Sequence, residues 1–447
     1  MELKAPFLAS KPFRVTHWHV LAISIPMSLA YLTTPLIGLV DTAVVGQFRD
    51  AAMLGGLAAG AVVFDLIFGT FNFLRSGTTG LVAQAFGRGD ALEQKAVFWR
   101  ASIVAAISGV ALVLLASSIA AICEWFMNTE QAVTSAMDLY IRIRLVSAPA
   151  ILINCAILGY LLGCGNAALG LLLQLLVNGV NLALSIFLAL HLGWGIEGVA
   201  WAAVCGETAA MIAGMTIILR RFRGGPKMSC RKAFNIAEMR RMFHLNGGIM
   251  TRSVALMGAY ILFARQGAQL GTLTLAANSV LMHFFLLAGY FLDGLSAAAE
   301  QLAGRAIGAR CKSTFSRAVR LTGGWGFALA GFASTVVFAF GEQLIRATTN
   351  AADVRSEAVA YLPWAAFASL SSVLAIQMNG VFTGATWSRE LRNTMLISLA
   401  AFIAALFTFG PLFGNQGLWA ALHIISADAW NMPAVGHAHR QQPVVGC

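Results

Sequence analysis

FLRSGTTGLVAQAFGR at residues 73–88 recurs about 217 residues later as FLDGLSAAAEQLAGR at residues 291–305, with one residue of slippage between the copies. A second pair supports this repeat, because GVAWAA at 198–203 returns as GLWAAL at 417–422 at nearly the same offset. A duplication on this scale in an apolar chain is typical of transporters built from two structural repeats, which bind their cargo near the repeat interface. The sequence therefore predicts two related halves in a membrane.

The composition indicates a chain that crosses a lipid bilayer many times. Hydrophobic residues make up 58% of the 447 positions and charged residues 11%, whereas roughly a quarter of the positions in a soluble domain are charged. Transmembrane strands are too short to produce the long apolar runs seen here, so we predict an all-α polytopic membrane protein. The apolar runs begin near Val20, Leu54, Ala96, Ala136, Leu169 and Gly198, and again near Leu245, Thr274, Ala318, Ala358 and Thr394.

These runs predict the domain boundaries. We expect a cytoplasmic N-terminus at 1–19, a six-helix bundle at 20–220, a basic linker at 221–243, a second helix bundle at 244–422 and a polar tail at 423–447.

Lys and Arg predict the orientation, because basic loops stay on the cytoplasmic side. With the N-terminus inside, the inner segments hold 21 of the 30 basic residues, eight of them between Arg220 and Arg241. The net charge of +11 therefore reflects topology in the inner membrane, and we expect no nucleic-acid partner. The linker could also bind anionic lipid headgroups, although orientation alone explains its charge.

The N-terminus and the cysteines could indicate other classes of protein. Three basic residues precede the first apolar stretch, as in a signal peptide, but the stretch continues to about Val45. A signal core is only roughly 7 to 15 residues long, so we expect an uncleaved first helix. The seven cysteines form no C-x-x-C pair, and we predict neither a metal site nor a disulfide framework from them.

Ionisable residues inside the apolar runs are the first functional candidates, because inserting each one costs about 2.5–3.5 kcal/mol or more. Asp41 lies in line with Gly38 and Thr34 at helical spacing. The same run contains Pro26 and Pro35, which remove backbone hydrogen bonds and allow a helix to bend. Asp41 has no basic residue within one turn of its own helix. We therefore expect it to exchange a proton near physiological pH.

Further polar candidates cluster in the first half. Four of them recur at i, i+4, i+7 and i+11 in the fifth apolar run, which places them on one helix face: Gln174, Asn178, Asn181 and Ser185. Other runs of this half contribute Asp65, Asn72, Arg75, Asn154 and Glu207. The set predicts a hydrated polar cavity, although amides also hold membrane helices together without touching a substrate. Asp65 could instead pair with Arg75, and Glu207 could make an interhelical hydrogen bond.

The second half carries different polar residues, so the repeats share a scaffold while their chemistry has diverged. Asp293 and Glu300 lie seven residues apart on one predicted helix face. They could line the substrate cavity, or they could pair with Arg252 or Arg265 and lock the bundle.

Three segments together resemble the multidrug and toxic compound extrusion (MATE) family, and specifically its DinF-like branch. They are IPMSLAYLTTPLIGLVDTAVVG at 25–46, FLRSGTTGLVAQAFGRGD at 73–90 and FLDGLSAAAEQLAGRAIGAR at 291–310. The resemblance extends from about residue 20 to 422 and keeps the order of the elements.

The resemblance implies twelve helices in two six-helix bundles arranged as a V, with alternating access to the two sides of the membrane. It also implies export of organic, often cationic and amphipathic compounds in exchange for protons or Na⁺. Asp41 and the amides Asn154, Asn178 and Asn181 match the residues that form the N-terminal ion or proton site of the family.

The sequence departs from the family at two places. Many members carry an acid where this chain has Ser185, and a Na⁺ site prefers hard oxygen ligands such as carboxylates, so the serine favours protons as the coupling ion. The second departure is HIISADAWNMPAVGHAH at 423–439, which should match the apolar stretch at 204–220 but is polar and contains Pro433. We therefore predict an incomplete twelfth helix after about Leu422, through a reading-frame error or a truncation.

The leading hypothesis is a monomeric antiporter that exports organic cations or amphipathic compounds in exchange for protons, with no other cofactor. Coupling to Na⁺ is one alternative. Export of lipid-linked or lipid intermediates is another, for which only Arg75 and Arg252 offer basic groups at membrane depth. An enzyme is disfavoured because the chain lacks H-E-x-x-H, G-x-S-x-G and a paired Asp motif.

Overall fold

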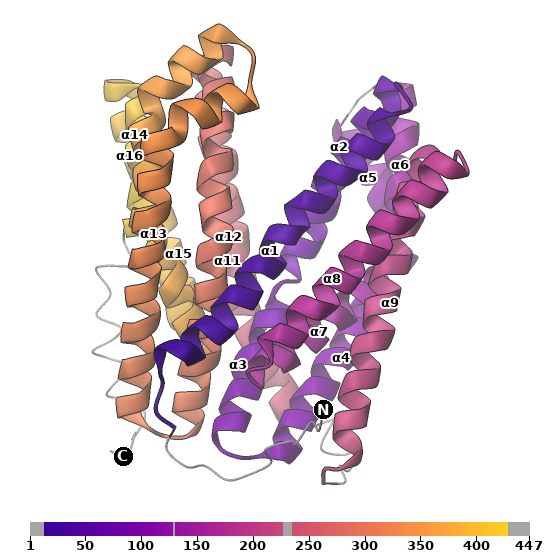
Figure 1. Ribbon diagram of the computed structural model, residues 1–447, viewed down its shortest axis with the longest axis vertical. Coiled ribbons are helices and arrows are strands. Elements are labelled where there is room, and N and C mark those ends of the chain that lie inside the picture. Colours follow the sequence, from indigo (N-terminus) through magenta and orange to yellow (C-terminus); the bar gives the residue numbers. More distant parts are fainter. Residues whose placement is uncertain (1–12, 128–129, 227–234, 428–447) are drawn as a thin grey trace. The chain divides into compact units, whose positions relative to one another are not determined.

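The computed structural model describes residues 13–127, 130–226 and 235–427, and helices are the only regular secondary structure in these residues. The first half contains α1 His17–Gly46, α2 Ala51–Thr70, α3 Phe73–Gly87, α4 Ala91–Leu114, α5 Ala116–Met127, α6 Gln131–Leu145, α7 Ala148–Gly163, α8 Ala167–Leu184, the π-helix η1 Ser185–His191 and α9 Gly195–Arg223. The second half contains α11 Ile236–Gln269, α12 Thr272–Gly308, α13 Lys312–Thr348, α14 Ala352–Ala385, α15 Ser388–Phe413 and α16 Asn415–Ala427 (Figure 1). The predicted all-helical class is confirmed.

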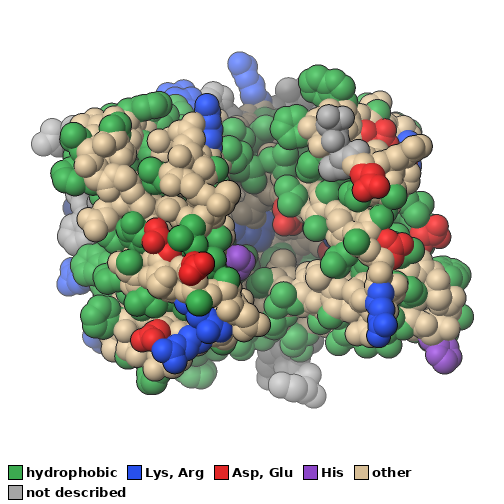
Figure 2. Space-filling model, turned by 90° about the horizontal axis from the view of Figure 1, so that it is seen from above, with side chains coloured by type: hydrophobic (Ala, Val, Ile, Leu, Met, Phe, Trp, Pro, Cys, Tyr) green, Lys and Arg blue, Asp and Glu red, His purple; other side chains and the backbone are tan. Residues whose placement is uncertain are grey.

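Most of these helices are long and apolar enough to cross a bilayer. In the described residues ten pass this test, and the pair α6–α7, bent by 51° at its break, makes an eleventh span. Six of the eleven come from the first half and five from the second. Many large hydrophobic side chains are exposed, as lipid contact requires, and Figure 2, which looks onto one end of the molecule, shows hydrophobic side chains around its rim. The chain is a multi-pass membrane protein.

Within the described residues, which stop at 427, α16 is shorter than a membrane span. Its 13 residues extend about 20 Å at 1.5 Å per residue, whereas a span needs about 20 residues. The helix nevertheless continues past Leu422 to Ala427, because its polar residue His423 is satisfied by packing. The ring nitrogens of His423 lie 2.8 Å from Ser371 Oγ and 3.2 Å from the Trp364 carbonyl oxygen. Residues 428–447, which include Pro433, lie outside the described residues.

The chain divides into two compact units that exchange their first helices. Of the described residues, unit 1 contains 29–226 and 235–242, and unit 2 contains 13–28 and 243–427. The start of α1 therefore packs within unit 2 and the start of α11 within unit 1. The boundaries predicted from the apolar runs follow chain order and not packing, and they stay a prediction.

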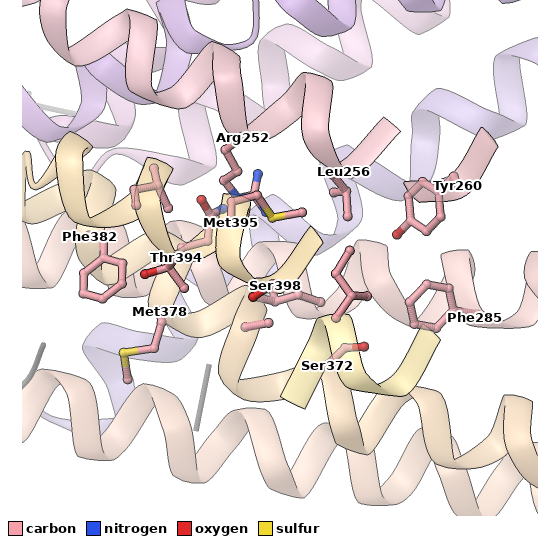
Figure 3. A pocket seen from close by; sticks show the side chains of 15 residues that line it. Arg252, Leu256, Tyr260, Phe285, Ser372, Met378, Phe382, Thr394, Met395 and Ser398 are labelled. Carbon is pink, nitrogen blue, oxygen red and sulfur yellow. The ribbon is translucent and has the colours of Figure 1, made fainter. Parts of the chain in front are cut away.

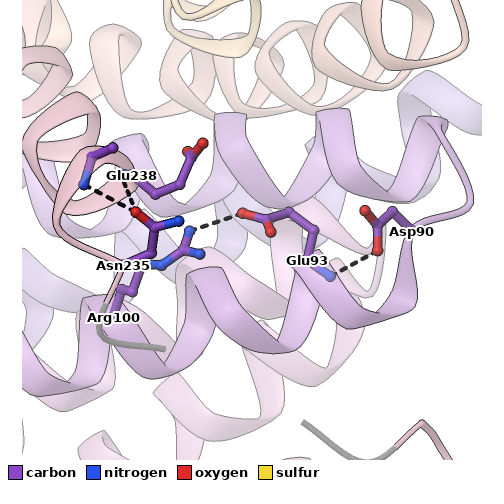
Figure 4. Close-up of polar contacts among 6 residues, drawn as sticks. Asp90, Glu93, Arg100, Asn235 and Glu238 are labelled. Atoms are coloured by element: carbon purple, nitrogen blue, oxygen red, sulfur yellow. Dashed lines mark hydrogen bonds and ion pairs between the residues drawn. The ribbon is translucent and has the colours of Figure 1, made fainter. Parts of the chain in front are cut away.

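Hydrogen bonds hold the start of α1 in unit 2, and apolar packing holds the start of α11 in unit 1. At the start of α1, Phe13 O accepts a hydrogen bond of 3.1 Å from Thr314 Oγ1, and Val15 O accepts one of 2.6 Å from Arg317 Nε. At the start of α11, Met242 is buried against the apolar core of unit 1. Figure 4 shows this end of α11 beside α4, where an ion pair of 2.8 Å joins Arg100 to Glu93.

The helices of unit 1 are interrupted, whereas the corresponding helices of unit 2 are continuous. Phe71 and Asn72 separate α2 from α3, Leu115 separates α4 from α5, and residues 146–147 separate α6 from α7. Pro149 near the start of α7 explains the last break, because proline cannot continue the hydrogen bonding of the preceding helix. α8 passes directly into η1, a π-helix, and π-helical turns are frequent at functional sites. In contrast, α12, α13 and α14 run for 37, 37 and 34 residues without a break.

Candidate functional site

The centre of the site is a hydrogen-bonded set formed by Asp41, Ser185 and Asn181. Asp41 comes from α1 and is only 7% exposed, while Asn181 and Ser185 are buried on one face of α8 and η1. Ser185 Oγ lies 3.3 Å from Asp41 Oδ1 and 3.2 Å from Asn181 Oδ1. The structure thus brings together three of the residues that the sequence singled out.

This arrangement can accept both protonation states of Asp41. A hydroxyl has one proton, so Ser185 donates either to the Asp41 carboxylate or to Asn181. If Asp41 is protonated, its own O–H can donate to Ser185, which then donates to Asn181. A chain of three groups that reverses its hydrogen bonds when one proton arrives is suited to proton exchange.

Close approach of α9 to α8 positions the face of α8 that carries Asn181, called the amide face below. A Cβ atom at Gly206 would lie 2.7 Å from Val177 O and 3.4 Å from Asn181 N. Any side chain at this position would therefore push α9 away from the turn that carries Asn181. Gly206 is a packing residue of the site.

Arg144 is the cation of the site, and the sequence analysis missed it. The guanidinium comes from the last turn of α6 and lies over the Phe64 ring, 4.0 Å from the ring centre. It is within electrostatic range of Asp41, Asp65 and Glu207. Its Nε atom is buried without a hydrogen-bond partner among the described residues. One basic side chain therefore faces three acids from three other helices.

A signal for Arg144 existed in the charge pattern. Under the predicted orientation, Arg142 and Arg144 belong to the few basic residues on the outer side. Arg142 is exposed and pairs with Asp138 at 2.7 Å. Arg144 is thus a basic residue on the outer side that this surface pair does not explain. Spacing along the helix of Asp41 cannot reveal a cation that comes from a different helix.

Four other polar candidates of unit 1 form two separate pairs. Asn154 Nδ2 donates to Glu207 O at 2.9 Å and to Glu207 Oε2 at 2.8 Å, so the interhelical hydrogen bond considered for Glu207 is present. Gln174 Nε2 donates to Asn178 Oδ1 at 3.1 Å. Asn154 and Asn178 thus contact partners other than Asp41, and only Arg144 links Glu207 electrostatically to the central set.

The suggested pairing of Asp65 with Arg75 is wrong. Asp65 makes no ion pair within the described residues, and the cation in its range is Arg144. Arg75 donates from Nε to Asn72 Oδ1 at 3.1 Å and from Nη2 to Ser76 Oγ at 3.0 Å. The reason is the break between α2 and α3, which ends the continuous helix on which Asp65 and Arg75 would share a face.

The other candidates lie away from this set. In unit 2, Asp293 is exposed on α12 and lies within electrostatic range of Arg252, whereas Glu300, seven residues on, is 3% exposed. Pro26 and Pro35 are both inside α1, which remains helical throughout. Each proline leaves the carbonyl four residues earlier without its helical donor.

Comparison with known proteins identifies the family. The MatE family model matches residues 26–187 and 250–409, which is most of the chain. The chain belongs to the MatE family. The resemblance to MATE proteins and to their DinF-like branch is thereby confirmed. Members of this family are transporters and not enzymes, so this MATE protein is a membrane transporter.

Individual relatives cover nearly the whole MATE chain. DNA damage-inducible protein F of Escherichia coli K12 is 32% identical over 412 residues, which are 92% of this chain and 89% of that protein. Protein DETOXIFICATION 44, chloroplastic, of Arabidopsis thaliana is 23% identical over 435 residues, covering 92% and 81%. The relationship to the first of these proteins is close enough to show the family by itself.

Solved structures share the fold. "Crystal structure of MATE in the bent conformation" superposes with a TM-score of 0.86 at 18% identity, covering 94% of both chains. "Outward-facing conformation of a multidrug resistance MATE family transporter of the MOP superfamily" has a TM-score of 0.85 at 17% identity, covering 95% of both. At this identity the likeness shows the two-bundle fold alone.

Proposed function

We propose that this transporter exports amphipathic organic cations in exchange for protons, by alternating access, and that Asp41 carries the proton. The observation that carries the proposal is the buried set Asp41–Ser185–Asn181, which can hold Asp41 either charged or protonated. An intramembrane acid is a functional group by default, because it is expensive to keep in the bilayer. The relative titled as a multidrug resistance transporter supports drug-like cargo.

Two features favour protons over Na⁺ as the coupling ion. Asp41 is the one carboxylate in contact with the buried hydroxyl and amide, so a metal ion would find few of the hard oxygens that it prefers. Arg144 already places a positive charge within range of the three acids of this region. The guanidinium therefore supplies part of the counter-charge that a bound metal ion would otherwise provide.

Protonation of Asp41 changes the charge balance around Arg144. With Asp41 charged, the guanidinium faces three acids; with Asp41 neutral, it faces Asp65 and Glu207 alone. A proton can shift the conformational equilibrium only through such a difference between states. α1 is the element to respond, because it carries Asp41 together with Pro26 and Pro35. The structures of one relative in bent and straight conformations support a fold with two states.

The acids also account for the charge of the cargo. Asp65 is exposed, and its nearby cation, Arg144, is shared with Asp41 and Glu207. Asp65 therefore keeps negative charge that attracts a substrate cation. We assign Asp65, Asn72, Gln174 and Glu207 to the substrate cavity of unit 1. We also infer a monomer in the inner membrane with a cytoplasmic N-terminus, on the charge pattern.

Transport by the reconstituted protein tests the proposal. Full-length protein in proteoliposomes is given a fluorescent cationic dye and either a proton or a Na⁺ gradient. We expect dye movement with the proton gradient and its loss in Asp41→Asn. Asp138→Asn is the matched control, because this acid lies in α6 but pairs on the surface with Arg142. Proton-driven transport by Asp41→Asn at the wild-type rate would overturn the assignment.

Lipid export receives no support from Arg75. Its guanidinium donates hydrogen bonds to Asn72 and Ser76 and lies 5.8 Å over the Tyr31 ring. These contacts describe a structural arginine at the break between α2 and α3.

A further inference from the structure

Unit 2 contains a pocket that the proposed proton exchange does not use. Helices α11, α12, α14, α15 and α16 enclose it, and its space, including the part open to the outside, is roughly 680 Å³. Figure 3 shows Arg252, Leu256 and Tyr260 along one wall, all from α11.

Arg252 lines the pocket without a partner. It makes no hydrogen bond and no ion pair with any described residue, and it is the one basic side chain among those that line the described pocket. The acid within its electrostatic range, Asp293, is not a lining residue. Asp293 supplies a counter-charge from outside the lining, while the N–H groups of Arg252 stay without a hydrogen-bond acceptor among the described residues and can donate to an anion in the pocket.

Other hydrogen-bonding groups line the same pocket. Asn379 from α14, Ser398 from α15 and Tyr260 from α11 make no side-chain hydrogen bond within the described part of the chain. Their atoms are not sealed in the core, because none belongs to the buried groups that lack partners. An amide N–H₂ and two hydroxyls add neutral donors to the guanidinium.

The rest of the lining is apolar. Phe285 lies beside Tyr260 at one end of the pocket, Leu256 lies between that end and Arg252, and Met378 and Phe382 lie at the other end (Figure 3). Arg252 and Tyr260 are eight residues apart, about 12 Å along the helix. Methionine adapts its shape to different ligands. A molecule that fills this space therefore needs a charged head and an apolar body of several carbon atoms.

We propose that this pocket of unit 2 binds an amphipathic anion, with one carboxylate or phosphate group on Arg252 and its apolar body towards Phe285. The guanidinium is the one charged group in the lining of the described pocket, and Asp293 in its range offsets part of its charge, so a head with a single negative charge fits better than one with two. A cationic substrate is excluded from the head position by repulsion. The pocket thus differs in ligand class from the polar site of unit 1.

Chain-matched probes test this ligand class. Full-length protein in phosphatidylcholine nanodiscs is titrated calorimetrically with decanoate, decyl phosphate, decanol and decyltrimethylammonium, which differ only in the head. We expect the two anions to bind at least about tenfold more tightly than decanol, as one hydrogen bond to a charged group predicts, and the cation to bind more weakly than decanol. Equal affinity of anions and decanol would overturn the proposal.

Two variants locate the binding. Arg252→Met should reduce anion affinity to that of decanol while decanol affinity stays unchanged. Arg265→Met is the matched control, because Arg265 is an exposed residue of the same helix outside the pocket. Ser398→Leu fills the pocket from α15 and should weaken anions and decanol together, so it tests the pocket even if Arg252→Met does not fold. Wild-type anion binding by Arg252→Met or by Ser398→Leu would contradict the assignment.

A change of lipid separates the two sources of such an anion. If phosphatidylglycerol in the nanodiscs competes with decyl phosphate in wild type but not in Arg252→Met, the ligand is a lipid headgroup. If it does not compete, the ligand is a free amphiphile. All these readouts measure binding without transport, so failure of the proton-exchange proposal would leave them unaffected.

Discussion

The two units carry opposite arrangements of charge on related helices. In unit 1, Arg144 lies within range of three acids from other helices. In unit 2, Arg252 lines a pocket beside neutral donors, and the acid in its range lies outside the lining. A surplus of negative charge favours cations, and an unsatisfied guanidinium favours anions. The two copies share one scaffold, and we propose that a few side chains give them different ligands.

The two units also differ in the continuity of their helices. Unit 1 has breaks beside the residues of its polar site, at Asn72, at Ser147 and in η1, which begins at Ser185. Unit 2 keeps long unbroken helices around an apolar core that includes Trp419 and Phe402. Interrupted helices turn side chains out of a regular face, so they can converge on one point. This difference supports the proposal that ion exchange takes place in the interrupted unit.

Removal of Arg144 is the strongest way to break the comparison. Arg144→Met leaves Asp41, Asp65 and Glu207 without their shared counter-charge. A buried charge without a counter-charge destabilises the protein by several kcal/mol. We expect proton-driven dye efflux from proteoliposomes to fall at least about tenfold. We also expect the remaining efflux to rise when Na⁺ is added, because a metal ion can then take the place of the guanidinium.

The control for this change is Arg142→Met, two residues away in the same helix. Arg142 is exposed, and its pair with Asp138 is worth little at the surface. The rate of dye efflux by Arg142→Met should match that of wild type. Efflux at wild-type rates by Arg144→Met, with no response to Na⁺, would show that the three acids need no counter-charge.

Substitution at Ser185 sharpens the assignment of the coupling ion. Ser185→Asp places a second carboxylate where Ser185 Oγ now lies 3.3 Å from Asp41 Oδ1. Two carboxylates form a better site for a hard cation, so we expect Na⁺ to stimulate dye efflux in this variant and not in wild type. Ser185→Ala should instead slow proton-driven efflux roughly three- to tenfold, by the loss of one hydrogen bond to a charged group. Identical ion dependence of all three proteins would contradict this reading.

Gly206 and Gly179 test packing of the amide face. A Cβ at Gly206 would meet Val177 O at 2.7 Å, whereas a Cβ at Gly179 on α8 would meet nothing within 4 Å. Gly206→Ala should lower stability by about 1–3 kcal/mol through overpacking, and Gly179→Ala should leave it equal or raise it by up to about 1 kcal/mol. Thermal melting in detergent measures both. A higher melting temperature for Gly206→Ala would mean that α9 can move without strain.

The smallest effect on transport is expected in the core of unit 2. Asn278 Oδ1 accepts hydrogen bonds of 3.0 Å from Asn415 Nδ2 and 2.9 Å from Trp419 Nε1, and its own Nδ2 donates to Asn415 Oδ1. Asn278→Leu leaves these buried groups unsatisfied, which costs about 1–3 kcal/mol each. We expect a lower melting temperature together with unchanged ion coupling of the folded fraction. Altered coupling at unchanged melting temperature would show that this network takes part in proton exchange.

The repeat, the helical class and the polar stripe of α8 followed from local pattern. Apolar runs of span length can only form helices in a bilayer, and helical spacing alone places Asn181 and Ser185 on one face. The end of α16 was harder to predict, because the tertiary partners of His423, Ser371 Oγ and the Trp364 carbonyl oxygen, extend the helix to Ala427.

Contacts between helices were decided by the tertiary structure alone. The sequence by itself determined which polar residues lie inside the membrane segments, because insertion energy depends on each segment and not on its neighbours. Only the fold decided that Arg144 reaches Asp41 from α6, that Asn154 bonds Glu207, and that a helix break separates Asp65 from Arg75. The physical reason is that Coulomb and hydrogen-bond energies depend on distance in space, and residues about 100 positions apart in the chain meet only when their helices pack.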